Sequence, residues 1–153
     1  MSNRVLYLLI LFFTISCTSQ KSEIEYIEFE HECGMLKVSD KIFIRILPSS
    51  KKQRKERIVE LTYHGKMFMR KPIPEGEYQK LIDAILQIKK EESENIESLI
   101  IFNDSGSNEI IYRKGSMMKK NFSFVLDKKY NSEFYNAAKL ITKAAELNIE
   151  DIR

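Results

Sequence analysis

The fold of this chain is decided by residues 58–70, which read Ile58-Val59-Glu60-Leu61-Thr62-Tyr63-His64-Gly65-Lys66-Met67-Phe68-Met69-Arg70. Two runs rich in apolar, β-branched and aromatic side chains flank the dipeptide His64-Gly65. Glycine at that place can adopt the positive φ angle that a tight hairpin requires. The stretch therefore predicts a β-hairpin with strands at 58–63 and 66–70.

Two further strands are expected before this hairpin. Residues 24–29 form a short apolar run with β-branched and aromatic side chains. Residues 41–47 alternate, so that Ile42, Ile44 and Ile46 fall on one face of an extended chain. A sheet of at least four antiparallel strands is the simplest arrangement of these segments.

A helix is expected after the hairpin. Pro72-Ile73-Pro74 predicts the end of the sheet, and proline is well placed near a helix start because its missing N–H would have no intrahelical partner. The next apolar residues recur at the spacing i, i+3, i+4, i+7 and i+8, which makes one apolar stripe for packing on the sheet. They are Tyr78, Leu81, Ile82, Ile85 and Leu86.

The second half of the chain repeats this pattern of strands followed by a helix. Residues 99–102 and 110–112 flank the polar segment 103–108, which predicts a second hairpin. An alternation further on predicts another strand; it consists of Phe122, Phe124 and Leu126. Asn131 or Ser132 is a competent N-cap for a closing helix. Its apolar face would be formed by Phe134, Ala137, Ala138, Ile141, Ala144 and Ala145.

The order ββββ-α-βββ-α predicts the α+β class, with an antiparallel sheet of six to seven strands and two amphipathic helices packed on it. Residues 23–153 have the length of one ordinary domain, so a single domain is expected there.

The first sixteen residues have the pattern of an export signal. Arg4 precedes the uncharged run Val5–Ile15, as the n-region and h-region of a secretory signal do. A helix of that run would be about 16 Å long at 1.5 Å per residue. The hydrocarbon core of a bilayer is about 30 Å thick. A cleaved signal is therefore expected in place of a permanent membrane span.

The segment Thr14-Ile15-Ser16-Cys17 resembles the lipobox of bacterial lipoproteins. Ser16 and Cys17 match that motif, whereas Thr14 stands where the family most often has leucine. The resemblance implies cleavage before Cys17, lipidation of its thiol and a short tether over residues 17–22. The alternative is ordinary signal cleavage after the small-x-small pair Thr14 and Ser16, and both alternatives export the protein.

Lipidation also decides the state of the two cysteines. If Cys17 carries lipid, Cys33 is a lone thiol. We then favour a role for Cys33 as a small buried apolar residue over a role as a nucleophile. If Cys17 is not lipidated, an oxidising compartment could pair it with Cys33. Thr18 follows the cysteine in place of the aspartate that commonly retains lipoproteins at the inner membrane, so resemblance to Gram-negative sorting implies the outer membrane.

Charge gives no general attraction to nucleic acid, since 25 basic residues stand against 22 acidic ones. Residues 51–57 are the densest basic stretch, and we expect them to project as a loop between two strands. Their basic residues are Lys51, Lys52, Arg54, Lys55 and Arg57. Such a loop could contact anionic lipid or an acidic protein partner, although a solvated connector is favoured. Residues 117–120, Met-Met-Lys-Lys, form a second basic surface before the last strand, with core packing as the alternative.

Candidates for catalysis or metal binding are few. His31 lies in Glu30-His31-Glu32-Cys33, but a structural zinc site needs four ligands and no second cluster complements this one, so a turn of solvated charges is expected. His64 belongs to the hairpin turn. Glu91, Glu92 and Glu94 follow two lysines in a linker. Phosphate-binding loops, nucleophile elbows and metal-binding helix motifs are absent from the sequence, which predicts no catalytic residue, metal or cofactor.

The sequence therefore favours a membrane-anchored envelope lipoprotein whose domain is a non-enzymatic protein-binding module. Small α+β immunity and inhibitor lipoproteins have a similar layout, which suggests a more specific role, by analogy of architecture alone. The rival hypothesis is an enzyme or small-ligand carrier with a pocket between sheet and helices and His31 or Cys33 at its rim. A structural subunit of an envelope complex is a third hypothesis, which a large exposed apolar patch would support.

Overall fold

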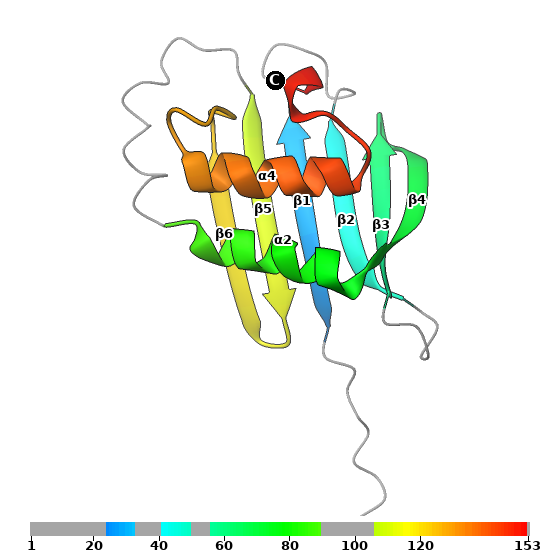
Figure 1. The fold of residues 1–153 in the computed structure, drawn as a ribbon. Helices are drawn as coiled ribbons and strands as arrows, with labels where there is room; N and C mark the ends of the chain where they lie inside the picture. The colour runs from blue at the N-terminus through cyan, green and yellow to red at the C-terminus, as the bar shows by residue number, and fades with distance from the viewer. Residues whose placement is uncertain (1–23, 33–40, 50–55, 90–105, 153) are drawn as a thin grey trace, which may run out of the picture.

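The computed structural model describes residues 24–32, 41–49, 56–89 and 106–152. These residues form a six-stranded antiparallel sheet with two helices on one face, so the predicted α+β class is confirmed (Figure 1). The elements in chain order are β1 (Glu25–Glu32), β2 (Ile42–Pro48), β3 (Glu56–Tyr63), β4 (Lys66–Pro74), α2 (Glu75–Gln87), β5 (Ser107–Lys114), β6 (Met117–Ser123), α4 (Ser132–Ala144) and the short 3-10 helix η2 (Ile149–Asp151).

The strand order across the sheet is β4-β3-β2-β1-β5-β6, and every neighbouring pair is antiparallel. Strand β1 is therefore central, although it comes first in the chain. It pairs with β2 through registers such as Phe29 with Ile44, and with β5 through Phe29 with Ile110. This second pairing joins the two halves of the sequence into one sheet.

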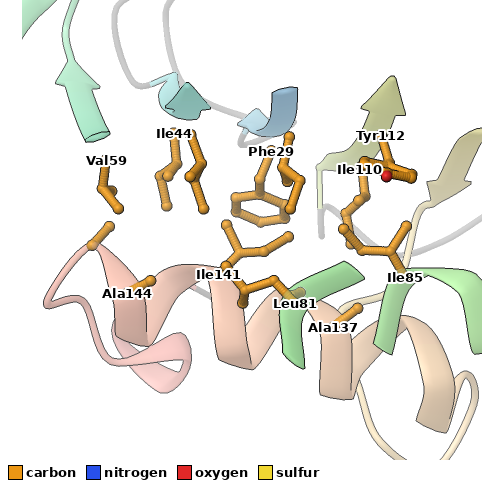
Figure 2. Packing of buried hydrophobic residues seen from close by; sticks show 14 of the residues in the cluster. Phe29, Ile44, Val59, Leu81, Ile85, Ile110, Tyr112, Ala137, Ile141 and Ala144 are labelled. Atoms are coloured by element: carbon orange, nitrogen blue, oxygen red, sulfur yellow. The ribbon is translucent and has the colours of Figure 1, made fainter. Parts of the chain in front are cut away.

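The core lies between the sheet and the two helices, which cross the same face of the sheet side by side in opposite directions (Figure 1). Side chains from the strands point toward the helices, and Phe29 of β1 faces Leu81 of α2 and Ile141 of α4 (Figure 2). All three side chains are almost completely buried. Burial of alternate strand residues on one face is what the period-2 pattern predicts, and the predicted face of Ile42, Ile44 and Ile46 is confirmed.

The hairpin of β3 and β4 is confirmed, and its turn has the expected geometry. His64 has a φ of 52° and Gly65 a φ of 71°. Two central residues with positive φ define the type I′ turn, whose twist matches that of the flanking strands. The dipeptide thus forms the turn because glycine tolerates this conformation without a steric cost.

Strand β4 extends past the predicted end at residue 70 and includes Pro72, but it ends at Pro74, within the triplet that was expected to end the sheet. Within the described part of the sheet, β4 is an edge strand that pairs only with β3. Proline is tolerated there because its missing N–H need not bond a neighbouring strand. Helix α2 begins directly afterwards at Glu75, with Pro74 as its N-cap residue.

Helix α2 buries Tyr78, Leu81, Ile82 and Ile85, as the stripe predicts. The prediction that Leu86 belongs to the core is wrong, because its side chain lies off the buried face and is 47% exposed. Ile88, just beyond the helix, is buried instead. Lys119 of β6 lies beside this end, and its Nζ donates hydrogen bonds to the carbonyl oxygens of Leu86 and Ile88 at 2.9 and 2.7 Å. These bonds satisfy carbonyls that a helix end leaves unpaired.

The predicted hairpin of residues 99–102 with 110–112 is wrong, because β5 is paired on both sides by β1 and β6. Ser107 and Asn108, expected in its turn, begin strand β5; residues 99–105 lie outside the described part of the chain. The hairpin that does form joins β5 to β6 through a turn at Gly115, whose φ is 57°. The 117–120 segment, expected before the last strand, belongs to β6 itself.

The predicted alternation of Phe122, Phe124 and Leu126 is also wrong, since β6 ends at Ser123. Asn121 and Ser123 are the residues of this strand that are buried on the helix side. Their polar surroundings include Asn108, whose Nδ2 donates to the carbonyl oxygen of Ser123 at 3.1 Å. The Ser123 hydroxyl donates to the carbonyl oxygen of Val125 at 2.7 Å, so hydrogen bonding explains a buried polar residue at this position. Nδ2 of Asn121 is buried without a hydrogen-bond partner among the described residues.

The closing helix agrees with the prediction. Helix α4 begins at Ser132, and the side-chain oxygen of its N-cap Asn131 accepts a hydrogen bond from the backbone N–H of Phe134 at 2.9 Å. Its predicted apolar face is buried from Phe134 to Ala145. In the described part of the chain no helix has the length and apolarity needed to span a membrane.

Candidate binding site at the β3–β4 hairpin

An apolar hollow of about 290 Å³ lies where the ends of β2, β3 and β4 meet the segment after α4. Its floor is formed by buried side chains of the core, including Ile42, Leu61 and Ile152. Among the described residues, its lining is Ile42, Leu61, Tyr63, Phe68, Leu147, Asp151 and Ile152. A rigid apolar floor of this kind suits an apolar group of a ligand or partner.

Phe68 dominates the rim of the hollow. The registers Leu61 with Met69 and Thr62 with Met67 leave Phe68 as an extra residue on β4, which is a β-bulge. Bulges bend a strand and redirect a side chain, and Phe68 is 76% exposed. Tyr63 and Met67 are exposed beside it in the same hairpin. We call Tyr63, Met67 and Phe68 the hairpin cluster.

The hollow offers little for acid–base chemistry. Of the lining residues that the structure describes, Asp151 is the one carboxylate, and Tyr63 contributes a phenol. General acid–base catalysis needs groups of tuned pKa held close to a reacting atom. Among the residues that the structure describes, no group of three or more histidine, cysteine, aspartate and glutamate side chains could hold a metal ion. The geometry favours contact with an apolar side chain, with Asp151 as an acceptor at the edge.

His31 does not lie in a solvated turn, so that expectation was wrong. It belongs to β1, is buried, and has its Nδ1 atom 2.8 Å from Oδ1 of Asn108. Glu30 forms an ion pair with Lys41 on the opposite face of the sheet. The buried pair of His31 and Asn108 joins β1 to β5, while Cys33 lies outside the described residues.

Arg57 is not part of a projecting loop either, because it lies in β3 with its side chain only 15% exposed. Its Nη2 donates to Oε2 of Glu25 at 2.8 Å. Its Nε and Nη2 donate to the two carboxylate oxygens of Glu75 at 2.9 and 3.1 Å. The guanidinium also lies over the ring of Tyr78, with Cζ 4.2 Å from the centroid. The other basic residues of that stretch, Lys51, Lys52, Arg54 and Lys55, fall outside the described ranges.

This cluster changes the acidity of its members. Burial lowers the pKa of Arg57, but the hydrogen bond with Glu75 and the charge of Glu25 outweigh burial, so that the pKa is raised. Burial, followed by the charge of Glu25, raises the pKa of Tyr112 to about 12. The Tyr112 hydroxyl donates to Oε1 of Glu25 at 3.1 Å. Opposite charges that are paired and hydrogen-bonded in this way can remain buried, and we interpret the cluster as a structural connection of β1, β3, β5 and α2.

Sequence reasoning did not identify the hollow or Phe68 as a site. The available signal was the run Met67-Phe68-Met69, three apolar residues in a strand that otherwise alternates. Such a run places large apolar side chains on both faces of the strand, so at least one of them faces away from the core. Leu147, Asp151 and Ile152 gave no local signal, because they join the site only through the packing of the C-terminal segment.

Cys17 lies outside the described ranges, as do Glu91, Glu92 and Glu94, so the roles assigned to them stay predictions from sequence. No protein-family model, curated protein or solved structure matches this chain.

Proposed function

We propose that this protein is an envelope lipoprotein, anchored through Cys17, whose domain is a non-enzymatic protein-binding module with the hairpin cluster and its hollow as the binding site. The observation that carries the proposal is the 76% exposure of Phe68 beside an apolar hollow with a buried floor. An aromatic side chain next to a preformed pocket is typical of the residues that dominate the energy of protein interfaces.

The size and chemistry of the hollow favour a protein over a small molecule. Its volume of about 290 Å³ is at the lower end of the roughly 300–1,000 Å³ of small-ligand pockets. It is sufficient for one large apolar side chain. Asp151 at the edge would pair with a lysine or arginine beside that side chain. We therefore expect a partner that presents an apolar anchor with a neighbouring basic residue.

The position of the hollow fits a tethered module. Strand β1 begins at Glu25, three residues after the end of the predicted tether of residues 17–22, and its later residue His31 pairs with Ile42 of the hollow. The hairpin cluster thus lies at the end of the sheet opposite to the start of β1 (Figure 1). A partner would reach it from the side away from the anchor. An immunity or inhibitor protein is the specific form of this proposal, with an envelope toxin or hydrolase as the partner.

A small-ligand carrier or enzyme is the second candidate. It was expected to use a space between sheet and helices, where large side chains instead pack against one another (Figure 2). The same hollow would have to serve it, with Asp151 and Tyr63 as its ionisable groups. Because the hollow offers so few ionisable groups, a small-ligand carrier or enzyme is the weaker proposal.

The anchor is tested by the intact mass of protein purified from membranes of the expressing cells, compared with Cys17→Ser. We expect a mature species that starts at Cys17 and is heavier by its acyl groups, and we expect this species to be lost in the variant. An unacylated species in the soluble periplasmic fraction would contradict the anchor and would reopen a disulfide between Cys17 and Cys33.

The binding site is tested by a photo-crosslinking amino acid at Met67, with Leu86 on helix α2 as the matched exposed position. We expect the crosslinker at position 67 to form one specific covalent adduct with a partner protein of the envelope, and the crosslinker at position 86 to form none. Phe68→Ala should reduce that adduct about tenfold or more, as removal of an interface anchor does. It should leave stability within about 0.5 kcal/mol, because Phe68 is exposed. Equal adducts from both positions, or an adduct unchanged by Phe68→Ala, would exclude the hairpin cluster as the site.

A further inference from the structure

The end of the molecule opposite to the hairpin cluster carries a second exposed apolar surface. It consists of Ile24, Lys114, Met117 and Met118, which we call the tether-pole surface. The backbone N–H of Gly115 donates to the carbonyl oxygen of Ile24 at 2.9 Å. This bond joins the β5–β6 turn to the residue directly before β1, at the point where the chain enters the domain (Figure 1).

Most of the exposed large apolar residues in the described part of the chain lie at these two ends; Leu86 and Tyr130 are exposed elsewhere. Ile24 is 59% and Met118 is 62% exposed, and Met117 beside them is exposed as well. Methionine at an exposed surface is typical of adaptable contacts with apolar groups. Large apolar side chains at a turn, next to basic ones, are suited to the boundary between headgroups and acyl chains of a bilayer.

The charge of this surface is basic. Lys114 is half exposed, and Arg113 precedes it in β5. The nearby carboxylate of Glu25 is 12% exposed and is already bonded by Arg57 at 2.8 Å and by the hydroxyl of Tyr112 at 3.1 Å. The Nζ atom of Lys114 lies 3.6 Å from Oε1 of Glu25, so Lys114 shares this carboxylate with Arg57 and Tyr112 while its own side chain stays half exposed. This arrangement leaves a cationic and apolar turn directed at the solvent.

We propose that the tether-pole surface docks on anionic lipid headgroups, an inference that rests on the proposed anchor at Cys17. Seven residue steps separate Cys17 from Ile24, so the surface stays within about 25 Å of the anchored cysteine at about 3.5 Å per step. Basic residues near a membrane are attracted by anionic lipids. Docking would fix the domain with the hairpin cluster directed away from the bilayer.

The absence of tryptophan from the sequence gives a direct test. Met118→Trp introduces a single fluorescent reporter into the tether-pole surface, and Phe68→Trp places the matched reporter at the opposite end. Each protein is purified from membranes, its acyl mass is measured, and it is reconstituted into phosphatidylcholine vesicles with or without phosphatidylglycerol, both with brominated acyl chains. The mass in the same preparation separates a failed anchor from a failed docking.

We expect the Met118→Trp emission to shift to shorter wavelength and to be quenched only when phosphatidylglycerol is present. High salt should reverse the quenching, because it screens the attraction of exposed charges. The Phe68→Trp emission should stay unquenched in both vesicles. Adding Lys114→Gln should weaken the docked state about fivefold, whereas Lys66→Gln at the start of β4 should have no effect.

Equal emission of Met118→Trp in the two vesicle types, or equal quenching of both reporters, would overturn the proposal. A Met118→Trp reporter that is quenched by neither vesicle but is shielded from aqueous iodide when envelope proteins are added would also overturn it. That last result would assign the surface to a protein.

Discussion

Replacement of Phe29 by alanine is expected to lower the free energy of unfolding by about 3–5 kcal/mol, the range for loss of a buried aromatic side chain. Phe29 is 0% exposed at the centre of β1, the strand on which both halves of the sheet assemble. Its ring faces Leu81 and Ile141 of the two helices (Figure 2). The truncation would thus open a cavity between β1 and the two helices α2 and α4.

Urea unfolding of the mature protein measures this loss. Domains of this size have a total stability of about 5–15 kcal/mol, so Phe29→Ala can abolish folding in a marginal case. Phe29→Leu is the second variant, for which a smaller loss and a folded protein are expected. Phe68→Ala is the matched control, because the same truncation at an exposed position should change stability by less than about 0.5 kcal/mol. Similar losses for Phe29→Ala and Phe68→Ala would contradict the packing described here.

Arg57→Met is expected to destabilise the protein by about 3 kcal/mol, the lower end of the cost of breaking a buried ion pair. The variant leaves the carboxylate of Glu25, which is 12% exposed, without its closest cation. The expected loss in the free energy of unfolding stays at the lower end of this range because the Tyr112 hydroxyl at 3.1 Å and Lys114 at 3.6 Å remain beside Glu25. Met keeps much of the volume that packs on Tyr78, so the effect reports charge more than shape.

A double-mutant cycle with Glu25→Gln separates the pair from its surroundings. We expect Arg57→Met combined with Glu25→Gln to be less destabilised than the sum of the single variants, because the second change removes the unpaired buried charge. Lys71→Met is the matched control: Lys71 pairs with the exposed Glu146 at 2.7 Å, and exposed pairs contribute about 0–1 kcal/mol. Additive losses in the cycle would show that the cluster is not a coupled unit.

Much of the fold could be predicted from short stretches of sequence. The β3–β4 turn follows from His64-Gly65, and the start of α4 follows from the side chain of Asn131. In both cases the deciding interaction lies within three residues. Where prediction failed, a distant segment often supplied the reason: the edge position of β4 allows Pro72, and the side chain of Asn108 bonds the backbone of Ser123 on the buried side of β6.

The candidate site was much less predictable. Arg57 belongs to a basic run in the sequence, and only Glu25 and Glu75, thirty-two and eighteen residues away, convert it into a buried connector. Phe68 is exposed because β4 gains one residue relative to β3, a register that pairing sets along the whole hairpin. Leu147 and Ile152 reach the hollow only after α4 has packed across the sheet.

The sequence by itself determined the α+β class, the turn at His64-Gly65, the buried stripe of α4, that of α2 except for Leu86, and the cap of α4, because these depend on backbone geometry and side-chain spacing over a few residues. Only the tertiary structure decided that β1 lies at the centre, that His31 and Asn108, seventy-seven residues apart, form a buried hydrogen bond, and that the two exposed apolar surfaces lie at opposite ends. The physical reason is that strand pairing and core packing bring together segments that are far apart in the chain. Which arrangement buries the most apolar surface with its polar groups hydrogen-bonded therefore depends on all of these segments together.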